Sequence, residues 1–170
     1  MNLKNSVLSF SSLTRFADSP LAFIDYKLNP KEPTPAMVLG TLVHRKVLEP
    51  EEYAKTVHVW PGARRGAAWK EFAEKHESRS IITASEATKI EAIALSVASH
   101  REASRLLQAC DDFEMEIRWK HDGTLHRGFV DARGPGFIVD LKVTVNTTPK
   151  DLQRMIYDRK YYMQAAMYMH

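Results

Sequence analysis

The chain has a single cysteine, Cys110, among 170 residues. One thiol excludes an intramolecular disulfide and any metal site built only from cysteines. The sequence also lacks an apolar run near the ~18 residues that span a bilayer, and its polar N-terminus lacks the features of a signal peptide. We therefore expect a cytoplasmic protein that does not enter a membrane.

Gly/Ser-rich linkers, internal repeats and low-complexity tracts are also lacking, which favours one domain over residues 1–170. Hydrophobic residues make up 44% of the chain, enough for a domain that buries roughly 70% of its unfolded surface. The net charge of +3 permits binding to a polyanion but does not argue for it. The positive charge is nevertheless uneven, and its two groups could each bind phosphate or simply form a solvated basic face. One group lies around the predicted hairpin at Arg118, Lys120, His121, His126, Arg127 and Arg133, and the other comprises Arg64, Arg65 and Lys70.

Hydrophobic periodicity predicts helices in the first part of the chain and strands later. Caps and prolines predict helices near residues 11–16, 21–27, 36–48, 67–76, 83–97 and 103–109, and two more from Thr148 to residue 170. Strands are predicted at residues 114–120, 124–132 and 137–143, with turns at Asp122-Gly123 and centred on Gly134 and Pro135. The predicted fold class is α/β, with a small, mainly antiparallel central sheet flanked by helices.

Two acids and a lysine lie around the second predicted turn: Asp131, Asp140 and Lys142. Side chains alternate along a strand, so Asp140 and Lys142 would project from one side, and Asp131 would lie opposite residue 138 or 139, within one step of Asp140. Hard carboxylate oxygens suit Mg²⁺ or Mn²⁺. A cation held by both aspartates and the Leu141 backbone carbonyl would leave positions for water and a phosphate oxygen, with Lys142 acting on the attacking water. This chemistry fits phosphodiester hydrolysis better than acyl transfer, because no nucleophilic serine or cysteine elbow is present.

Each of these residues also has a simpler explanation when it is taken singly. His44 could be a buried helix histidine, and Asp131 could cap a turn. Asp140 and Lys142 could form a surface ion pair worth at most about 1 kcal/mol. Tyr168 could belong to an ordinary packing stripe on the last helix. The order and spacing of the whole set favour a catalytic site over these alternatives.

Four segments occur in a fixed order: Gly40-Thr41-Leu42-Val43-His44, Gly128-Phe129-Val130-Asp131, Asp140-Leu141-Lys142 and Gln164-Ala165-Ala166-Met167-Tyr168. They resemble the GxxxH, G-x-x-D, D-x-K and QxxxY elements of the PD-(D/E)XK nuclease superfamily. Within that superfamily the resemblance is to RecE-like and RecB-like phage-type exonuclease domains, and it extends over nearly the whole chain.

The resemblance implies a restriction-endonuclease-like core and a Mg²⁺-dependent DNA exonuclease, with Mn²⁺ as a substitute. The expected substrate is a double-stranded DNA end, degraded 5′ to 3′ in recombination or repair. His44 would join Asp131 and Asp140 as a metal ligand, and Lys142 would act on the attacking water. The remaining implied residues are Gln164, Tyr168, Arg127 and Thr144 for DNA contacts, and Glu114 as a weaker candidate for an outer-shell or second-metal role, with Glu116 as its competitor. An iron–sulfur cluster is excluded, because relatives that hold one carry a cysteine where this chain has Ser19.

Two departures from the family pattern leave alternatives open. Relatives often have a hydroxyl residue directly after the lysine, whereas here Val143 precedes Thr144. RecE-type domains usually continue beyond the QxxxY helix, so a C-terminally truncated or minimal version is expected. The alternatives are a catalytically impaired DNA-binding or assembly module of the same fold and a structure-specific endonuclease. A single-strand annealing protein and a homo-oligomer are partners implied by the family alone.

Overall fold

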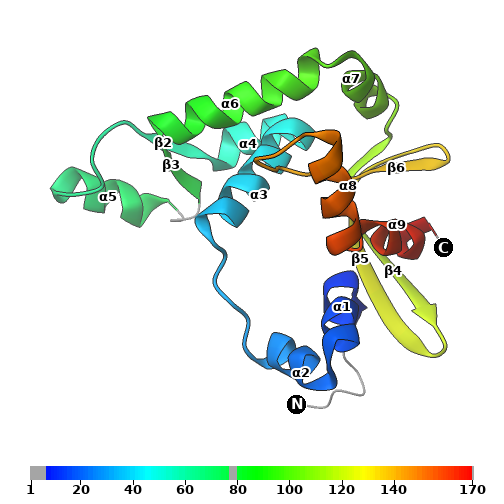
Figure 1. Cartoon of the computed structure of the whole chain (residues 1–170). Coiled ribbons are helices and arrows are strands. Elements are labelled where there is room, and N and C mark those ends of the chain that lie inside the picture. The colour runs from blue at the N-terminus through cyan, green and yellow to red at the C-terminus, as the bar shows by residue number, and fades with distance from the viewer. Residues whose placement is uncertain (1–6, 77–79, 170) are drawn as a thin grey trace. The chain divides into compact units, whose positions relative to one another are not determined.

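The computed structural model describes residues 7–76 and 80–169 (Figure 1). The chain forms two compact units. Unit 1 draws on Met1–Glu32, Asp111–Asp140 and Thr144–His170, and unit 2 on Pro33–Cys110 and Leu141–Val143. The described residues contain no helix that combines the length and the apolar character needed to cross a membrane.

Unit 1 is built on a mixed sheet of four strands, ordered β1-β5-β4 with β6 also paired to β5. The strands are β1 (Leu8–Ser9), β4 (Asp112–His121), β5 (Thr124–Gly134) and β6 (Phe137–Val139). The β4 and β6 strands run antiparallel to β5, and only β1 runs parallel to it. The predicted mixed α/β class with a mainly antiparallel sheet is therefore confirmed.

The two hairpin turns fix the register of this sheet. Asp122 and Gly123 both have positive φ, 46° and 73°, as a type I′ turn requires. At the second turn Gly134 pairs with Phe137, so Pro135 and Gly136 form the connection. The prediction of a turn centred on Gly134 and Pro135 is wrong by one residue, because the left-handed φ of 83° that closes the turn belongs to Gly136.

The third predicted strand is also shorter than expected. Its ladder ends at the pair Ala132–Val139, and residues 140–143 follow without strand structure. The prediction that Asp140 and Lys142 project from the same side of one strand is therefore wrong, because β6 stops before both of them.

Side-chain caps start the first three helices of unit 1. The helices are α1 (Phe10–Asp18), α2 (Pro20–Leu28), α8 (Pro149–Asp158) and α9 (Tyr161–Met169). Ser9 caps α1 in a capping box with Ser12, and Ser19 caps α2 ahead of Pro20 at the first helical position. Thr148 accepts a hydrogen bond from the Asp151 backbone N–H at the start of α8, as predicted.

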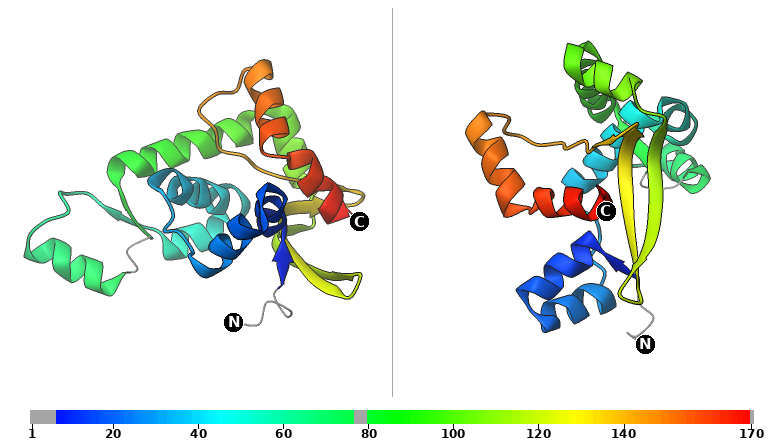
Figure 2. Two further views of the ribbon diagram at one scale, coloured as in Figure 1. Left: turned by 60° about the horizontal axis from the view of Figure 1, so that its bottom comes forward. Right: turned by 90° about the vertical axis from the view of Figure 1, so that its right-hand side faces the viewer.

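Unit 2 consists of helices, coloured light blue to green in Figure 2, and a pair of short parallel strands. Its elements are α3 (Pro35–Leu48), α4 (Pro50–Thr56), β2 (His58–Trp60), α5 (Ala67–Lys75), β3 (Ile81–Thr83), α6 (Ala84–Ser99) and α7 (Arg101–Gln108). Leu42 and Val43 of α3 pack with Ile82 and Ile90 in its core, each at most 5% exposed. Burial of such side chains contributes roughly 1.5–3 kcal/mol each. The predicted helices of this unit are confirmed, whereas β2, α4 and β3 were not predicted.

Candidate metal centre

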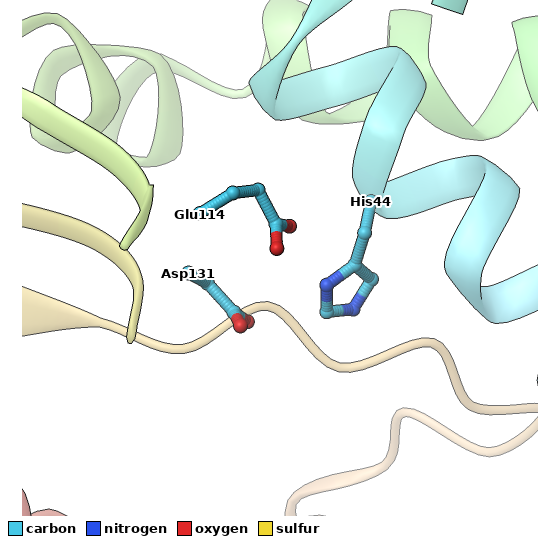
Figure 3. A group of neighbouring side chains, drawn as sticks. All are labelled: His44, Glu114 and Asp131. Atoms are coloured by element: carbon cyan, nitrogen blue, oxygen red, sulfur yellow. The ribbon is translucent and has the colours of Figure 1, made fainter. Parts of the chain in front are cut away.

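Two carboxylates face each other across the β4–β5 ladder. Phe113 pairs with Ala132 and Met115 with Val130, so Glu114 lies opposite Asp131, and directly opposite residues share a face of the sheet. The two half-buried side chains bring carboxylate oxygens within 4.8 Å of each other. Figure 3 shows them leaving neighbouring strands and pointing the same way.

The backbone at Glu114 is unusual for a strand. Its φ of +47° lies in the left-handed region, which costs a residue with a side chain roughly 1–2 kcal/mol. The ladder pairs on either side keep the same register, so no extra residue is inserted there. A residue in such a conformation persists only where its surroundings over-determine it, and such residues concentrate at functional sites.

The electrostatics of this pair favour a cation. Two negative charges no more than 4.8 Å apart repel each other by at least about 3 kcal/mol at an effective dielectric constant near 20. A divalent cation between them adds two attractions that outweigh this repulsion. Carboxylate oxygens are the ligands that Mg²⁺ and Mn²⁺ prefer, so the side chains present fit such an ion.

Glu116, the competitor of Glu114 in the sequence, is engaged elsewhere. Its carboxylate accepts hydrogen bonds from Arg118 Nε at 3.0 Å and from Arg118 Nη2 at 3.2 Å. The sequence ranked Asp140 ahead of both glutamates. The carboxylate that faces Asp131 across the ladder is nevertheless Glu114.

Asp140 is the first residue after β6, and it is exposed. One further step of the β5–β6 ladder beyond Ala132–Val139 would set it opposite Asp131. Gln164 of α9 lies beside it, with Nε2 donating to Asp140 Oδ1 at 3.5 Å. The aspartate of the D-x-K motif and the glutamine of the QxxxY motif therefore meet in unit 1.

The second residue of the QxxxY motif packs on the strand that carries Asp131. A Cβ built on Gly128 would lie 2.8 Å from Tyr168 Cζ and 2.9 Å from Cδ1, so the half-buried ring rests directly on the glycine backbone. Gly128 and Tyr168, taken from two separate predicted motifs, thus form one contact between β5 and α9.

The remaining predicted residues lie as follows. Arg127 of β5 is exposed, with its guanidinium 6.0 Å from the centre of the Phe129 ring. Thr144 makes a hydrogen bond within its own loop, where its Oγ1 accepts from the Asn146 N–H at 3.4 Å. The half-buried residues Leu141 and Lys142 belong to unit 2, as does His44 on α3, which Figure 3 also draws.

Residues 9–170 match the model of a protein family described as a PDDEXK-like domain of unknown function (DUF3799). A search of the curated proteins found no match to the chain.

Proposed function

The chain belongs to the PDDEXK-like family, and we propose that it is a divalent-metal-dependent deoxyribonuclease that hydrolyses phosphodiester bonds. Membership confirms the predicted superfamily and gives the chain a nuclease-type fold. The observation that carries the proposal is the carboxylate pair Glu114–Asp131, whose oxygens lie within 4.8 Å on adjacent strands. A pair of this kind in a nuclease-type fold is best explained as a cation site.

Asp131 and Glu114 would hold the cation, with Asp140 as a further oxygen ligand. We propose His44 as a nitrogen ligand and the Leu141 carbonyl as a backbone ligand, on the strength of the ordered motifs. Mg²⁺ is the proposed ion and Mn²⁺ its substitute. When bound, such an ion supplies Lewis-acid stabilisation of the negative charge that develops on a phosphate.

Lys142 would hold the attacking water in line or lower the pKa of that water through its positive charge, and would then stabilise the negative charge that develops on the pentacoordinate phosphate. Gln164 would act as a positioning residue, because its amide donates to Asp140 and so restricts the rotation of that carboxylate. Tyr168, packed on Gly128, would fix α9 against the strand that carries Asp131.

For the substrate we propose double-stranded DNA ends degraded from 5′ to 3′. The resemblance of the four ordered motifs to RecE-like and RecB-like exonucleases supports this choice. A free end also distinguishes an exonuclease from an endonuclease in a simple assay.

The proposal is tested by incubating end-labelled linear duplex and closed circular DNA with the protein in Mg²⁺, Ca²⁺ or EDTA. We expect Mg²⁺ to support degradation of the linear duplex alone. Asp131→Asn should lose cleavage because a ligand charge is removed. Lys142→Ala should lose cleavage by about a hundredfold or more, as when other stabilising donors are removed, while its calorimetric affinity for metal stays close to that of the wild type.

Three results would contradict parts of this proposal. Nicking of closed circular DNA would show that the protein is an endonuclease and not an exonuclease. DNA binding without cleavage in every metal, unchanged in Asp131→Asn, would instead identify a non-enzymatic DNA-binding module. Loss of metal affinity in Lys142→Ala would remove the role given to the lysine.

A further inference from the structure

The strand that carries Asp131 presents a row of side chains on its exposed face. Even-numbered positions of β5 face inward, and Gly128, Val130 and Ala132 are buried. Arg127 and Phe129 occupy the opposite face together with Asp131. Residues two apart on a strand repeat about every 6.7 Å, so the row spans about 13 Å from Arg127 to Asp131.

Phe129, in the middle of this row, is 52% exposed. A single exposed apolar side chain is ordinary on a protein surface. This one, however, lies two residues from a proposed metal ligand and has the guanidinium of Arg127 6.0 Å from its ring centre. Aromatic rings and arginine guanidinium groups bind nucleic acid strands. Here both lie beside the carboxylate pair.

The neighbouring strand adds a second cation to the same face. Arg118 of β4 lies directly opposite Arg127, and like charges placed opposite each other destabilise a sheet. Glu116 offsets part of this repulsion through its ion pair with Arg118 at 2.9 Å. Lys120 follows on the same face, opposite Leu125.

A third element brings another positive charge to Arg127. Lys27 of α2 has a lowered pKa, first because of its burial and then because of the positive charge of Arg127. Its Nζ donates to the Val7 carbonyl at 2.8 Å, which holds the amine in place. Cations from two other elements, β4 and α2, thus lie near Arg127, and an anionic ligand would relieve their mutual repulsion.

We propose that this face, the hairpin track (Arg118, Arg127 and Phe129), binds one strand of the DNA substrate and leads it to the Glu114–Asp131 pair. The arginines hold phosphates through their planar forks. Phe129 stacks on a base, a contact that tolerates any sequence. The 13 Å row corresponds to a few nucleotides, which places the stacked base close to the bond that is cut. The nature of the substrate rests on the proposed function.

Substitution of Glu116 should change DNA affinity in a direction that a purely structural role would not produce. Its carboxylate lies on the hairpin track beside Arg118, so it opposes a phosphate there. Removal of this charge by Glu116→Gln should therefore tighten DNA binding, whereas loss of Arg127 should weaken it.

The test measures binding of a fluorescent duplex with a single-stranded overhang by anisotropy, in Ca²⁺, at several salt concentrations. Arg127→Ala should weaken binding about tenfold and reduce the slope of log K against log salt by roughly 0.7–0.9, the value for one lost phosphate contact. Glu116→Gln should bind more tightly than the wild type. The matched control is Arg154→Ala on α8, which removes one cation paired with Asp158 and should change affinity less than twofold.

Phe129 is tested in the same assay. Phe129→Ala should weaken binding about tenfold, as expected for loss of one stacked base, and should leave the salt slope unchanged because no charge is lost. Phe129→Trp should restore binding, and Phe129→Leu should not. Thermal unfolding of each variant shows whether the fold is kept.

The outcomes separate this proposal from the proposed function. One outcome is that the wild type cuts DNA while both Arg127→Ala and Phe129→Ala bind DNA as tightly as the wild type. That result would contradict the hairpin track and leave the proposed nuclease activity supported. If no metal supports cleavage but both variants weaken binding as stated, the track stands and the nuclease fails. A wild-type protein that binds no DNA overturns the hairpin track.

Discussion

Glu114 combines two features at one position of β4: a carboxylate opposite Asp131 and a backbone φ of +47°. The conformation costs the fold about 1–2 kcal/mol for a residue with a Cβ atom. Glycine adopts positive φ without that cost. A glycine at position 114 should therefore relieve the backbone strain while it removes a metal ligand.

We predict that Glu114→Gly is more stable than Glu114→Ala by about 1 kcal/mol, because only the glycine relieves the left-handed strain. Both variants should lose metal affinity, since both lack the carboxylate. Urea unfolding of the two proteins gives the difference in their free energies of unfolding, when both show the same dependence of free energy on urea concentration. A glycine variant that unfolds at lower urea than the alanine variant would show that the strain is absent.

The pairing of Glu114 with Asp131 could have been predicted from the sequence. The two-residue turn Asp122-Gly123 fixes the register of the hairpin, and counting outward from it sets residue 114 against residue 131. Glu114 was only a weaker candidate, implied by the resemblance to the nuclease family, and the second turn was used to place Asp131 beside Asp140 instead. The positive φ of Glu114 could not have been predicted, since only surrounding tertiary contacts can impose it on a residue of this type.

Between elements, α9 lies directly on the backbone of β5 at Gly128. The Tyr168 ring lies where a Cβ of residue 128 would have to be. Gly128 is therefore required by the close approach of the helix, and a methyl group there must displace the ring.

We predict that Gly128→Ala lowers the free energy of unfolding by about 1–3 kcal/mol, the usual cost of overpacking. Tyr168→Ala removes the obstacle, so the double variant should lose less than the sum of the two single changes. Chemical denaturation of the four proteins gives the coupling. Simple additivity would show that the ring and the glycine are not in contact.

Gly40 provides a matched control for this experiment. A Cβ at Gly40 of α3 would meet no atom within 4 Å, and glycine inside a helix is destabilising relative to alanine. Gly40→Ala should therefore raise stability by about 0.5–1 kcal/mol. The two glycines come from two of the predicted motifs and should respond with opposite signs.

The strength of the local signal decided which elements the sequence could predict. The long strands β4 and β5 and the capped helices carry enough periodicity or capping chemistry to be recognised. The strands β1, β2 and β3 have only two or three residues each, too few for alternation to appear. The end of β6 at Val139 depends on the ladder itself, and the continued alternation of polar and apolar residues to Val143 concealed it.

At the scale of the whole molecule, unit 1 joins the first part of the chain, Met1–Glu32, to two segments from its last third, Asp111–Asp140 and Thr144–His170. The resemblance of ordered motifs predicted that the segments around residues 131, 140 and 164 belong together, and the contact of Gln164 with Asp140 agrees with it. Local patterns carry no signal for the division into two units, because that division depends on contacts between distant segments. The single domain over residues 1–170 stays a prediction.

The central claim is that Glu114 and Asp131 share a divalent cation, and calorimetric titration of the protein with Mn²⁺ tests it most directly. We predict saturable binding by the wild type and at least about tenfold weaker binding by both Glu114→Gln and Asp131→Asn, because each substitution replaces a charged ligand by a neutral amide. Glu116→Gln, which changes the carboxylate paired with Arg118, should bind nearly as the wild type does. Equal Mn²⁺ affinity in the wild type, Glu114→Gln and Asp131→Asn would contradict the claim.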